Sequence, residues 1–170
     1  IFQQVNDLKF YHAREIDLNG EKIILSRTGY TGELGFEIYA SGNNIQKIWE
    51  VLLSKGVQPC GLGVRDLLRM EMKYCLYGND IDESTNPLEA GLSWITDFKN
   101  QFIGIENLKR CKSNGLDRNL VALKLEERGI PRKGYLIYNE DNIIGEICSG
   151  TQSLALNCGI GLGYVKNGFH

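Results

Sequence analysis

The side chain best placed to bind a small molecule is Glu37, which follows a glycine-rich loop over residues 28–35. Its neighbours Phe36 and Ile38 are apolar, so in a strand the carboxylate lies on one face and both apolar side chains on the other. A carboxylate can accept two parallel hydrogen bonds from a planar N–H pair, as found in pterins, guanidines and amidines. An ordinary exposed glutamate on an antiparallel strand fits the same pattern, and that alternative stays open.

A second candidate is Arg65, which opens a predicted helix after Gly61 and Gly63. A guanidinium is planar and always charged, so at such a helix entry it can hold a carboxylate or a carbonyl group. Asp66 and Arg69 follow at a spacing that also allows a surface ion pair, worth about 0.2–0.5 kcal/mol. The residues alone favour neither interpretation.

Aromatic residues flank these polar groups at Tyr30, Tyr74, Tyr77 and Trp94. Aromatic rings with a hydrogen-bonding tip suit a flat heteroaromatic ligand. Trp94 lies between apolar neighbours, so a simple core position is an equal alternative for it.

The acidic cluster Asp80, Asp82 and Glu83 could suggest a metal site, but its spacing lacks the rest of a calcium loop. A solvated acidic turn is the favoured interpretation, and no metal is expected. The glycine loops match neither the phosphate-loop pattern nor GxGxxG, which argues against nucleotide binding. The histidines, His12 and His170, lie near the two ends, which argues against histidine-based catalysis.

Composition narrows the function classes further. The 170 residues carry a formal net charge of -2, and no basic stripe marks a nucleic-acid surface. No apolar run reaches the roughly 18 residues of a transmembrane helix, so no membrane partner is expected. The five cysteines are odd in number and lack CxxC spacing, which favours reduced thiols over disulfides or zinc ligands. The chain begins without methionine or a secretion signal, and we expect it to be a fragment of a longer protein.

The elements that must position the candidates follow from periodicity. In the first half the pattern predicts strands over residues 8–16, 22–27 and 36–40, with a hairpin turn at Asn19 and Gly20. Ser41 caps a predicted helix that Gly56 ends, with Ile45, Ile48, Trp49, Leu52 and Leu53 on its apolar face. A short extended segment over 57–60 precedes a second helix over 62–73.

The second half changes character after a polar stretch over residues 77–86. A short helix is predicted over 88–94 and an amphipathic helix over 102–112. Residues 113–117 read as a linker. Beyond it only short strands are predicted, which is typical of a small β-barrel; they cover residues 120–125, 134–138, 143–149 and 161–165. We therefore expect an α+β fold of antiparallel strands and two helices over residues 1–114, followed by a truncated all-β barrel domain over 115–170.

Taken in order, the motifs resemble one family. The segments RTGYTGELGFEI, RDLLRMEMKYCLYGNDIDESTNPLEAGLSW and FIGIENL, with GIPRKGYLIY and IGEICSGTQSLALNCGIGLGYV, are similar to the aminomethyltransferase (T-protein) family of the glycine cleavage system. The resemblance covers residues 8 to 165. It implies a folate-binding module followed by the family's barrel domain.

The resemblance also implies a reaction and roles for residues. An aminomethyl group arrives on the lipoyl sulfur of the carrier (H) protein, tetrahydrofolate attacks its carbon, and ammonia leaves. At the matching positions Glu37 would grip the pterin amino edge, Tyr30 would line the same pocket, Arg65 would fix the folate, and Trp94 would pack near its tail. The family's catalytic aspartate lies in sequence absent here, so no catalytic residue is assigned and the fragment alone is expected to be inactive.

Other functions remain open beside this one. Relatives with the same pattern include folate-binding modules of iron–sulfur assembly without transferase activity, and folate domains of dimethylglycine and sarcosine enzymes. A non-enzymatic barrel interaction domain is a further possibility. The resemblance implies a cytoplasmic location in a bacterium, or the mitochondrial matrix in a eukaryote.

Overall fold

The computed structural model describes residue 5 and residues 7–18 and 20–169. The chain forms two compact units, Ile1–Leu68 and Arg69–His170. The first combines a three-stranded sheet with helices, and the second is dominated by a four-stranded sheet. The predicted α+β fold class is confirmed.

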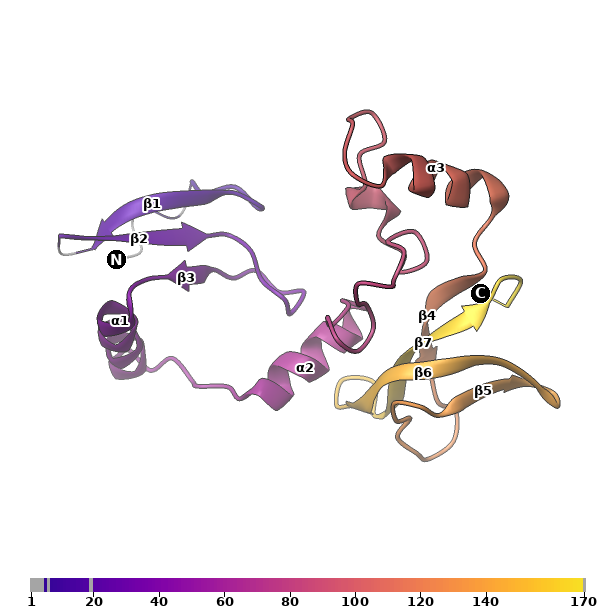
Figure 1. The fold of residues 1–170 in the computed structure, drawn as a ribbon. Coiled ribbons are helices and arrows are strands. Elements are labelled where there is room, and N and C mark those ends of the chain that lie inside the picture. Colours follow the sequence, from indigo (N-terminus) through magenta and orange to yellow (C-terminus); the bar gives the residue numbers. More distant parts are fainter. Residues whose placement is uncertain (1–4, 6, 19, 170) are drawn as a thin grey trace. The chain divides into compact units, whose positions relative to one another are not determined.

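The sheet of the first unit contains β1 (Ala13–Leu18), β2 (Glu21–Ser26) and β3 (Glu37–Tyr39) in that spatial order, all antiparallel (Figure 1). The β1–β2 hairpin closes between Leu18 and Glu21, and Gly20 has the positive φ of +85° that such a turn requires. Its predicted partner in the turn, Asn19, lies outside the described residues.

The first predicted strand is placed wrongly at its start. Residues 8–12 form turns rather than a strand, with hydrogen bonds from the Leu8 amide to the Val5 carbonyl and from the His12 amide to the Lys9 carbonyl. Tyr11 has a φ of +62°, which no strand allows. Leu8 is nevertheless buried in the core. The apolar residue that suggested a strand thus packs from an irregular segment.

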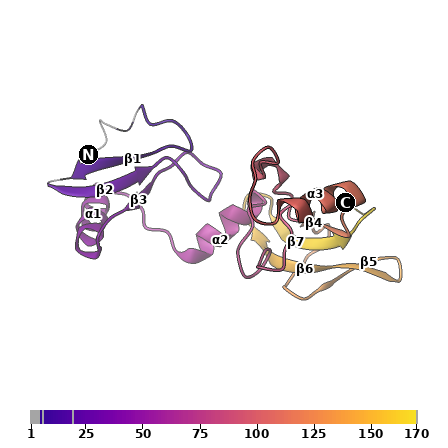
Figure 2. The ribbon, with the colours of Figure 1, turned by 45° about the horizontal axis from the view of Figure 1, so that its top comes forward.

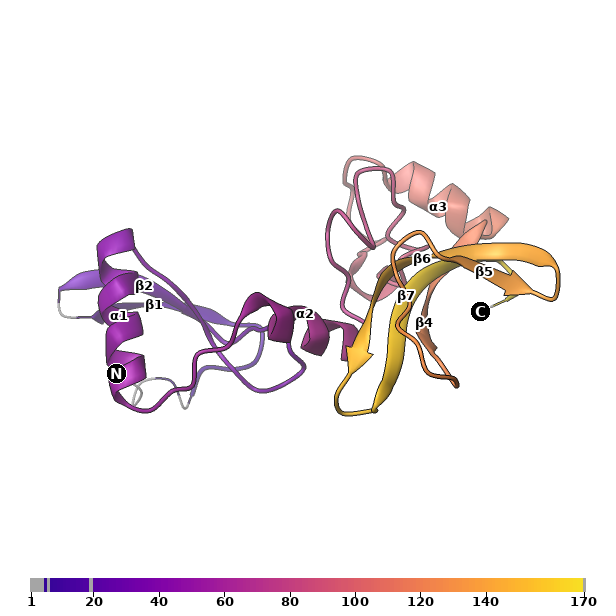
Figure 3. The same ribbon diagram turned by 90° about the horizontal axis from the view of Figure 1, so that it is seen from below.

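Helix α1 (Gly42–Ser54) lies against one face of this sheet (Figure 3). Ser41 is its N-cap residue, although its side chain makes no capping hydrogen bond. Gly56 ends the helix as predicted, with a φ of +83° and its amide bonded to the Leu53 carbonyl. Only part of the predicted apolar face is buried. Ile48 packs in the core with Ile16, Ile23 and Leu25, whereas Trp49 is 52% exposed.

Helix α2 (Leu62–Glu71) ends two residues earlier than predicted, because Lys73 has a φ of +58° that ends the helical path. The boundary between the two compact units falls within it. The segment before it, residues 57–60, is exposed and forms no strand. Met70 is buried, whereas Met72 is exposed.

In the second unit, the predicted helix over 88–94 is wrong in extent. Residues 87–91 form turns, and only a 3-10 helix, η1 (Ser93–Ile95), follows. Helix α3 (Ile105–Asn114) lies two or three residues beyond its predicted bounds and buries Ile105. It begins after Gly104, whose φ of +91° suits only glycine, so the chain reverses there before the helix can start.

The second sheet contains β4 (Arg118–Lys124), β5 (Leu136–Asn139), β6 (Asn142–Ser153) and β7 (Cys158–Lys166), in the order β4-β7-β6-β5 (Figure 2). All neighbouring strands are antiparallel, and from β4 onward the part of the unit that the structure describes contains strands alone, as predicted. Glycines on β6 and β7 let the loop between β4 and β5, residues 125–135, lie directly on this sheet. A β-carbon on Gly150 would stand 2.0 Å from the Pro131 carbonyl oxygen, and one on Gly159 would stand 2.3 Å from that of Gly129.

Candidate functional site

Glu37 lies on the face of the first sheet that points away from α1. Ile38 packs against the core cluster that contains Ile48 of α1, and side chains alternate along a strand. Glu37 therefore points to the opposite face, as the sequence predicts. The strand register places Ser26 directly across from it. Because Glu37 is half-buried, it is more than an ordinary exposed glutamate.

A chain of hydroxyl groups holds this carboxylate. The Thr28 hydroxyl donates a hydrogen bond to Oε2 of Glu37, and Oγ of Ser26 lies 2.8 Å from Oγ1 of Thr28. Ser26 is the last residue of β2, and Thr28 opens the glycine loop. Sequence reasoning missed Thr28. No signal in the sequence identifies it, because its place beside Glu37 follows from the pairing of β2 with β3 in the structure.

The start of the loop is anchored to the segment before β1. The Arg27 guanidinium donates to the Leu8 carbonyl at 2.7 Å, and the Arg27 amide donates to the His12 carbonyl at 2.9 Å. Its guanidinium also lies 6.0 Å from the ring centre of Phe36. These contacts fix the residue immediately before Thr28, so the hydroxyl chain starts from a constrained backbone.

Tyr30 and Arg65 lie in contact with each other. The guanidinium carbon of Arg65 lies 4.4 Å from the ring centre of Tyr30, within the range of a cation–π contact. Tyr30 belongs to the glycine loop and Arg65 to the first part of α2. Arg65 is exposed, whereas Tyr30 is half-buried. One face of the ring is thus covered by the cation, which leaves the guanidinium edge able to donate hydrogen bonds to a ligand.

Trp94 lies in η1 and is 71% exposed. The alternative of a core position is therefore wrong for Trp94. A large aromatic ring held at the surface by a short helix is available to contact a ligand.

The interpretation of Arg69 and Asp80 as surface residues is wrong. Arg69 and Asp80 are each 1% exposed and form an ion pair of 2.6 Å. The same carboxylate oxygen accepts the Leu76 amide at 2.9 Å, and Arg69 also donates to the Ser149 hydroxyl at 3.0 Å. The Tyr164 hydroxyl donates to the Asp80 carbonyl at 2.9 Å. The pair therefore ties the end of α2 and the loop after it to the second sheet.

Asp82 behaves as the acidic turn residue that the sequence predicts. It is exposed, and its carboxylate accepts hydrogen bonds from the Ser84 amide and from the Ser84 and Thr85 hydroxyls. These bonds hold the pKa of Asp82 below its usual range, and the Ser84 hydroxyl has the largest effect. Among the residues that the structure describes, no cluster of three His, Cys, Asp or Glu side chains could hold a metal ion.

Two thiols that the Asp80 carboxylate influences, Cys75 and Cys148, are poor nucleophiles. Burial raises the pKa of Cys75 and Cys148, and the Asp80 carboxylate raises both further. Both side chains pack against the core cluster of Leu120, Leu162 and Tyr164. At neutral pH they are protonated and serve as small apolar groups.

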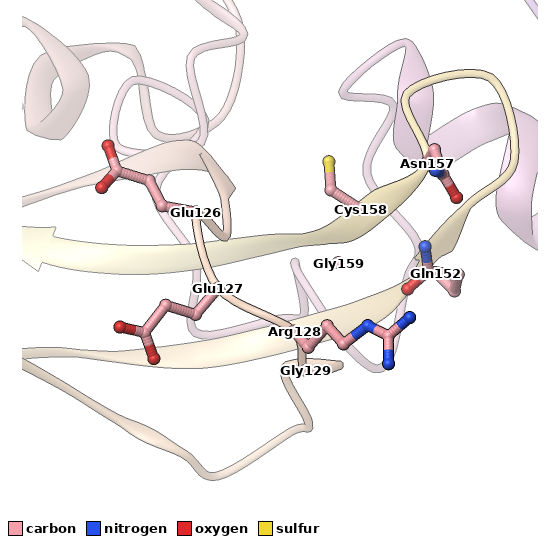
Figure 4. A pocket seen from close by; sticks show the side chains of 8 residues that line it. All are labelled: Glu126, Glu127, Arg128, Gly129, Gln152, Asn157, Cys158 and Gly159. Carbon is pink, nitrogen blue, oxygen red and sulfur yellow. The ribbon is translucent and has the colours of Figure 1, made fainter.

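The second unit also carries a polar depression of about 410 Å³ (Figure 4). It lies where residues 126–129 of the loop after β4 meet the β6–β7 hairpin. Glu126, Arg128, Gln152 and Cys158 are among its lining residues. None of the predicted site residues lines it. Its lining mixes acidic, basic and amide groups, which favours no one class of ligand, so we assign no ligand to this depression.

Comparison with known proteins identifies the family. Residues 2–100 match the model of the GCVT N-terminal domain, and residues 118–170 match that of the glycine cleavage T-protein C-terminal barrel domain. The aminomethyltransferase of Halothermothrix orenii is 50% identical over 167 residues, which is 95% of this chain and 47% of the relative. That of Flavobacterium psychrophilum is 48% identical over 152 residues, covering 86% and 42%.

A solved structure of an aminomethyltransferase is also similar to this chain. The crystal structure of glycine cleavage system aminomethyltransferase T from Bartonella henselae has a TM-score of 0.87 and 34% identity, covering 95% of this chain and 45% of that one. The chain spans about half the length of the relatives it matches. No described helix is both long and apolar enough to cross a membrane. With two family domains matched in order, the chain belongs to the glycine cleavage T-protein (GCVT) family.

Proposed function

We propose that the protein carrying this chain is the aminomethyltransferase of a glycine cleavage system. It would move the aminomethyl carbon from a lipoylated carrier (H) protein to tetrahydrofolate, with release of ammonia and formation of methylene-tetrahydrofolate. The observation that carries the proposal is the held carboxylate of Glu37, which lies within a family domain and in the same compact unit as the stacked Tyr30–Arg65 pair.

The residues fit a pterin as substrate. A pterin presents a planar N–H pair, which an acceptor-only carboxylate can bind through two parallel hydrogen bonds. Glu37 offers such a carboxylate on an open sheet face, with one oxygen already oriented by Thr28. We assign Glu37 to the pterin edge, Tyr30 to the wall of its pocket, Arg65 to a polar group of the folate, and Trp94 to the region of its tail.

In this proposal the chain contributes positioning rather than acid–base chemistry. Holding two reactants in attack geometry can supply about 7–11 kcal/mol of the barrier reduction. The family's catalytic aspartate is assigned to upstream sequence, so none of residues 1–170 is given a catalytic role. We further propose that residues 1–114 belong to the folate-binding domain and 115–170 to the barrel domain. Because the relatives compared are bacterial, a cytoplasmic location is part of the proposal.

The test is a transfer assay on the protein at its natural length. Carrier protein loaded with the aminomethyl group is mixed with tetrahydrofolate, and ammonia and methylene-tetrahydrofolate are measured together. We expect equimolar formation of both, and neither product when tetrahydrofolate is omitted. Tetrahydrofolate binding without transfer would instead indicate a folate-binding module of the family. Absence of both binding and transfer would refute the proposal.

The role of Arg65 makes a separate prediction. Arg65→Lys keeps the positive charge but loses the planar fork and much of the stacking on Tyr30. The stacked Arg65 is oriented before the ligand arrives, whereas an unstacked lysine must be immobilised on binding at a cost of about 0.5–1.5 kcal/mol, so tetrahydrofolate should bind about two- to tenfold more weakly. Fluorescence titration would measure this. Lys47→Arg on exposed α1 is the matched control, and equal affinities of wild type and Arg65→Lys would contradict the assignment.

A further inference from the structure

The hydroxyl chain beside Glu37 has a defined direction. A hydroxyl carries a single hydrogen, and that of Thr28 is donated to Oε2 of Glu37. The 2.8 Å contact between Ser26 and Thr28 must therefore be donated by Ser26. The chain runs from Ser26 through Thr28 to the carboxylate, and successive donors in such a chain strengthen one another.

The first donor of this chain of hydroxyl groups, Ser26, belongs to the sheet rather than to the loop. Ser26 is 8% exposed and lies on the central strand β2, paired with Ala13 on one side and with Glu37 on the other. Thr28 follows two residues later, where the backbone is anchored through Arg27. Both donors are thus placed before any ligand arrives.

The hydrogen bond from Thr28 restricts the rotation of the carboxylate but leaves it able to accept hydrogen bonds from a ligand. Each carboxylate oxygen has two lone pairs, so Oε2 can accept from Thr28 and still accept from a ligand. A glutamate side chain otherwise rotates about three bonds, and its terminal torsion is broad. Thr28 therefore sets the plane in which both oxygens of Glu37 face a bidentate partner.

We infer that Thr28 is a positioning residue for substrate binding, which fixes the carboxylate plane of Glu37 for the paired N–H groups of the pterin edge. The inference rests on the proposed function and adds to it a cause of ligand specificity. A carboxylate held in a fixed plane favours ligands that donate two parallel hydrogen bonds over those that donate one, because only the former gain from that plane.

The first test removes the hydroxyl without changing the shape of the side chain. Thr28→Val in the natural-length protein should bind tetrahydrofolate about two- to tenfold more weakly, the range expected when one side chain must be immobilised on binding. The KM for tetrahydrofolate should rise while kcat stays nearly constant, since the lost interaction acts in the ground state as well. Thr28→Ser should restore the affinity, and Thr31→Val serves as the control in the same loop.

The decisive comparison uses a tetrahydrofolate analogue with a methyl group in place of the 2-amino group. This probe cannot present the N–H pair, so Thr28→Val should bind it as well as the wild type does. Equal weakening for both ligands would show a merely structural role and overturn the inference. If Glu37→Ala loses tetrahydrofolate but Thr28→Val does not, the inference fails while the proposed function stands. If the wild type binds no tetrahydrofolate, both fail.

Discussion

Changing Asp80 to asparagine is expected to lower the free energy of unfolding of the Arg69–His170 unit by about 3–5 kcal/mol. The substitution keeps the size of the side chain but removes the charge, and Arg69 then stays buried as an uncompensated cation. The carbonyl oxygen of an asparagine can still accept from Arg69, yet neutral acceptors bind a guanidinium more weakly than a carboxylate does. Because whole proteins are stable by only about 5–15 kcal/mol, much of the stability of this unit would be lost.

Urea unfolding followed by circular dichroism would measure the shift of the midpoint. Glu83→Gln is the matched control: it removes the same charge from an exposed residue of the same segment and should leave the midpoint nearly unchanged. Replacing both partners with apolar residues, as Arg69→Met with Asp80→Leu, should recover part of the loss, since no single charge is then left buried. A midpoint for Asp80→Asn equal to that of Glu83→Gln would mean that the ion pair does not support the fold.

This pair also marks the limit of sequence reasoning for the fold. Local signals predicted much of the fold: short runs between turn residues located the four strands of the second sheet, although β6 and β7 are longer than predicted, and Gly56 ended α1 where expected. Arg69 and Asp80 looked like surface residues because charged residues usually are. In the structure Arg69 donates to Ser149, which lies 80 residues further along the chain. Periodicity contains no information about such a contact.

The candidate site shows the same contrast between residues that sequence patterns identify and contacts that only the folded structure reveals. Glu37, Tyr30 and Arg65 were singled out from residue type and from the family resemblance, and their roles stay predictions; the structure adds that Arg65 lies over the ring of Tyr30. Thr28 was missed because its importance depends on the register between β2 and β3, which sets Ser26 opposite Glu37. A one-residue change of register would turn the side chains to the other face. The sequence alone does not fix the register when, as here, a loop of ten residues joins the two strands.

Glu37→Gln is expected to weaken tetrahydrofolate binding about a hundredfold, the largest effect predicted for the site. Hydrogen bonds to a charged group contribute about 1.5–3 kcal/mol each, and the pterin edge would lose the charge in both. The amide also places an N–H donor where one carboxylate oxygen stood, so that two donors face each other. When the Thr28 hydroxyl keeps donating to the oxygen of the new amide, the amide nitrogen is left toward the ligand.

The measurement is a tetrahydrofolate titration of the natural-length protein, with circular dichroism to show that the sheet is unchanged. Glu15→Gln is a matched control, since Glu15 is an exposed carboxylate of the same sheet that pairs with Lys22 at the surface. Its affinity should equal that of the wild type. Glu37→Asp separates charge from reach: it keeps the two acceptor oxygens but draws them back by one methylene, so its affinity should fall between those of the wild type and Glu37→Gln. If Glu37→Gln binds as tightly as Glu15→Gln, the pterin is not held by this carboxylate.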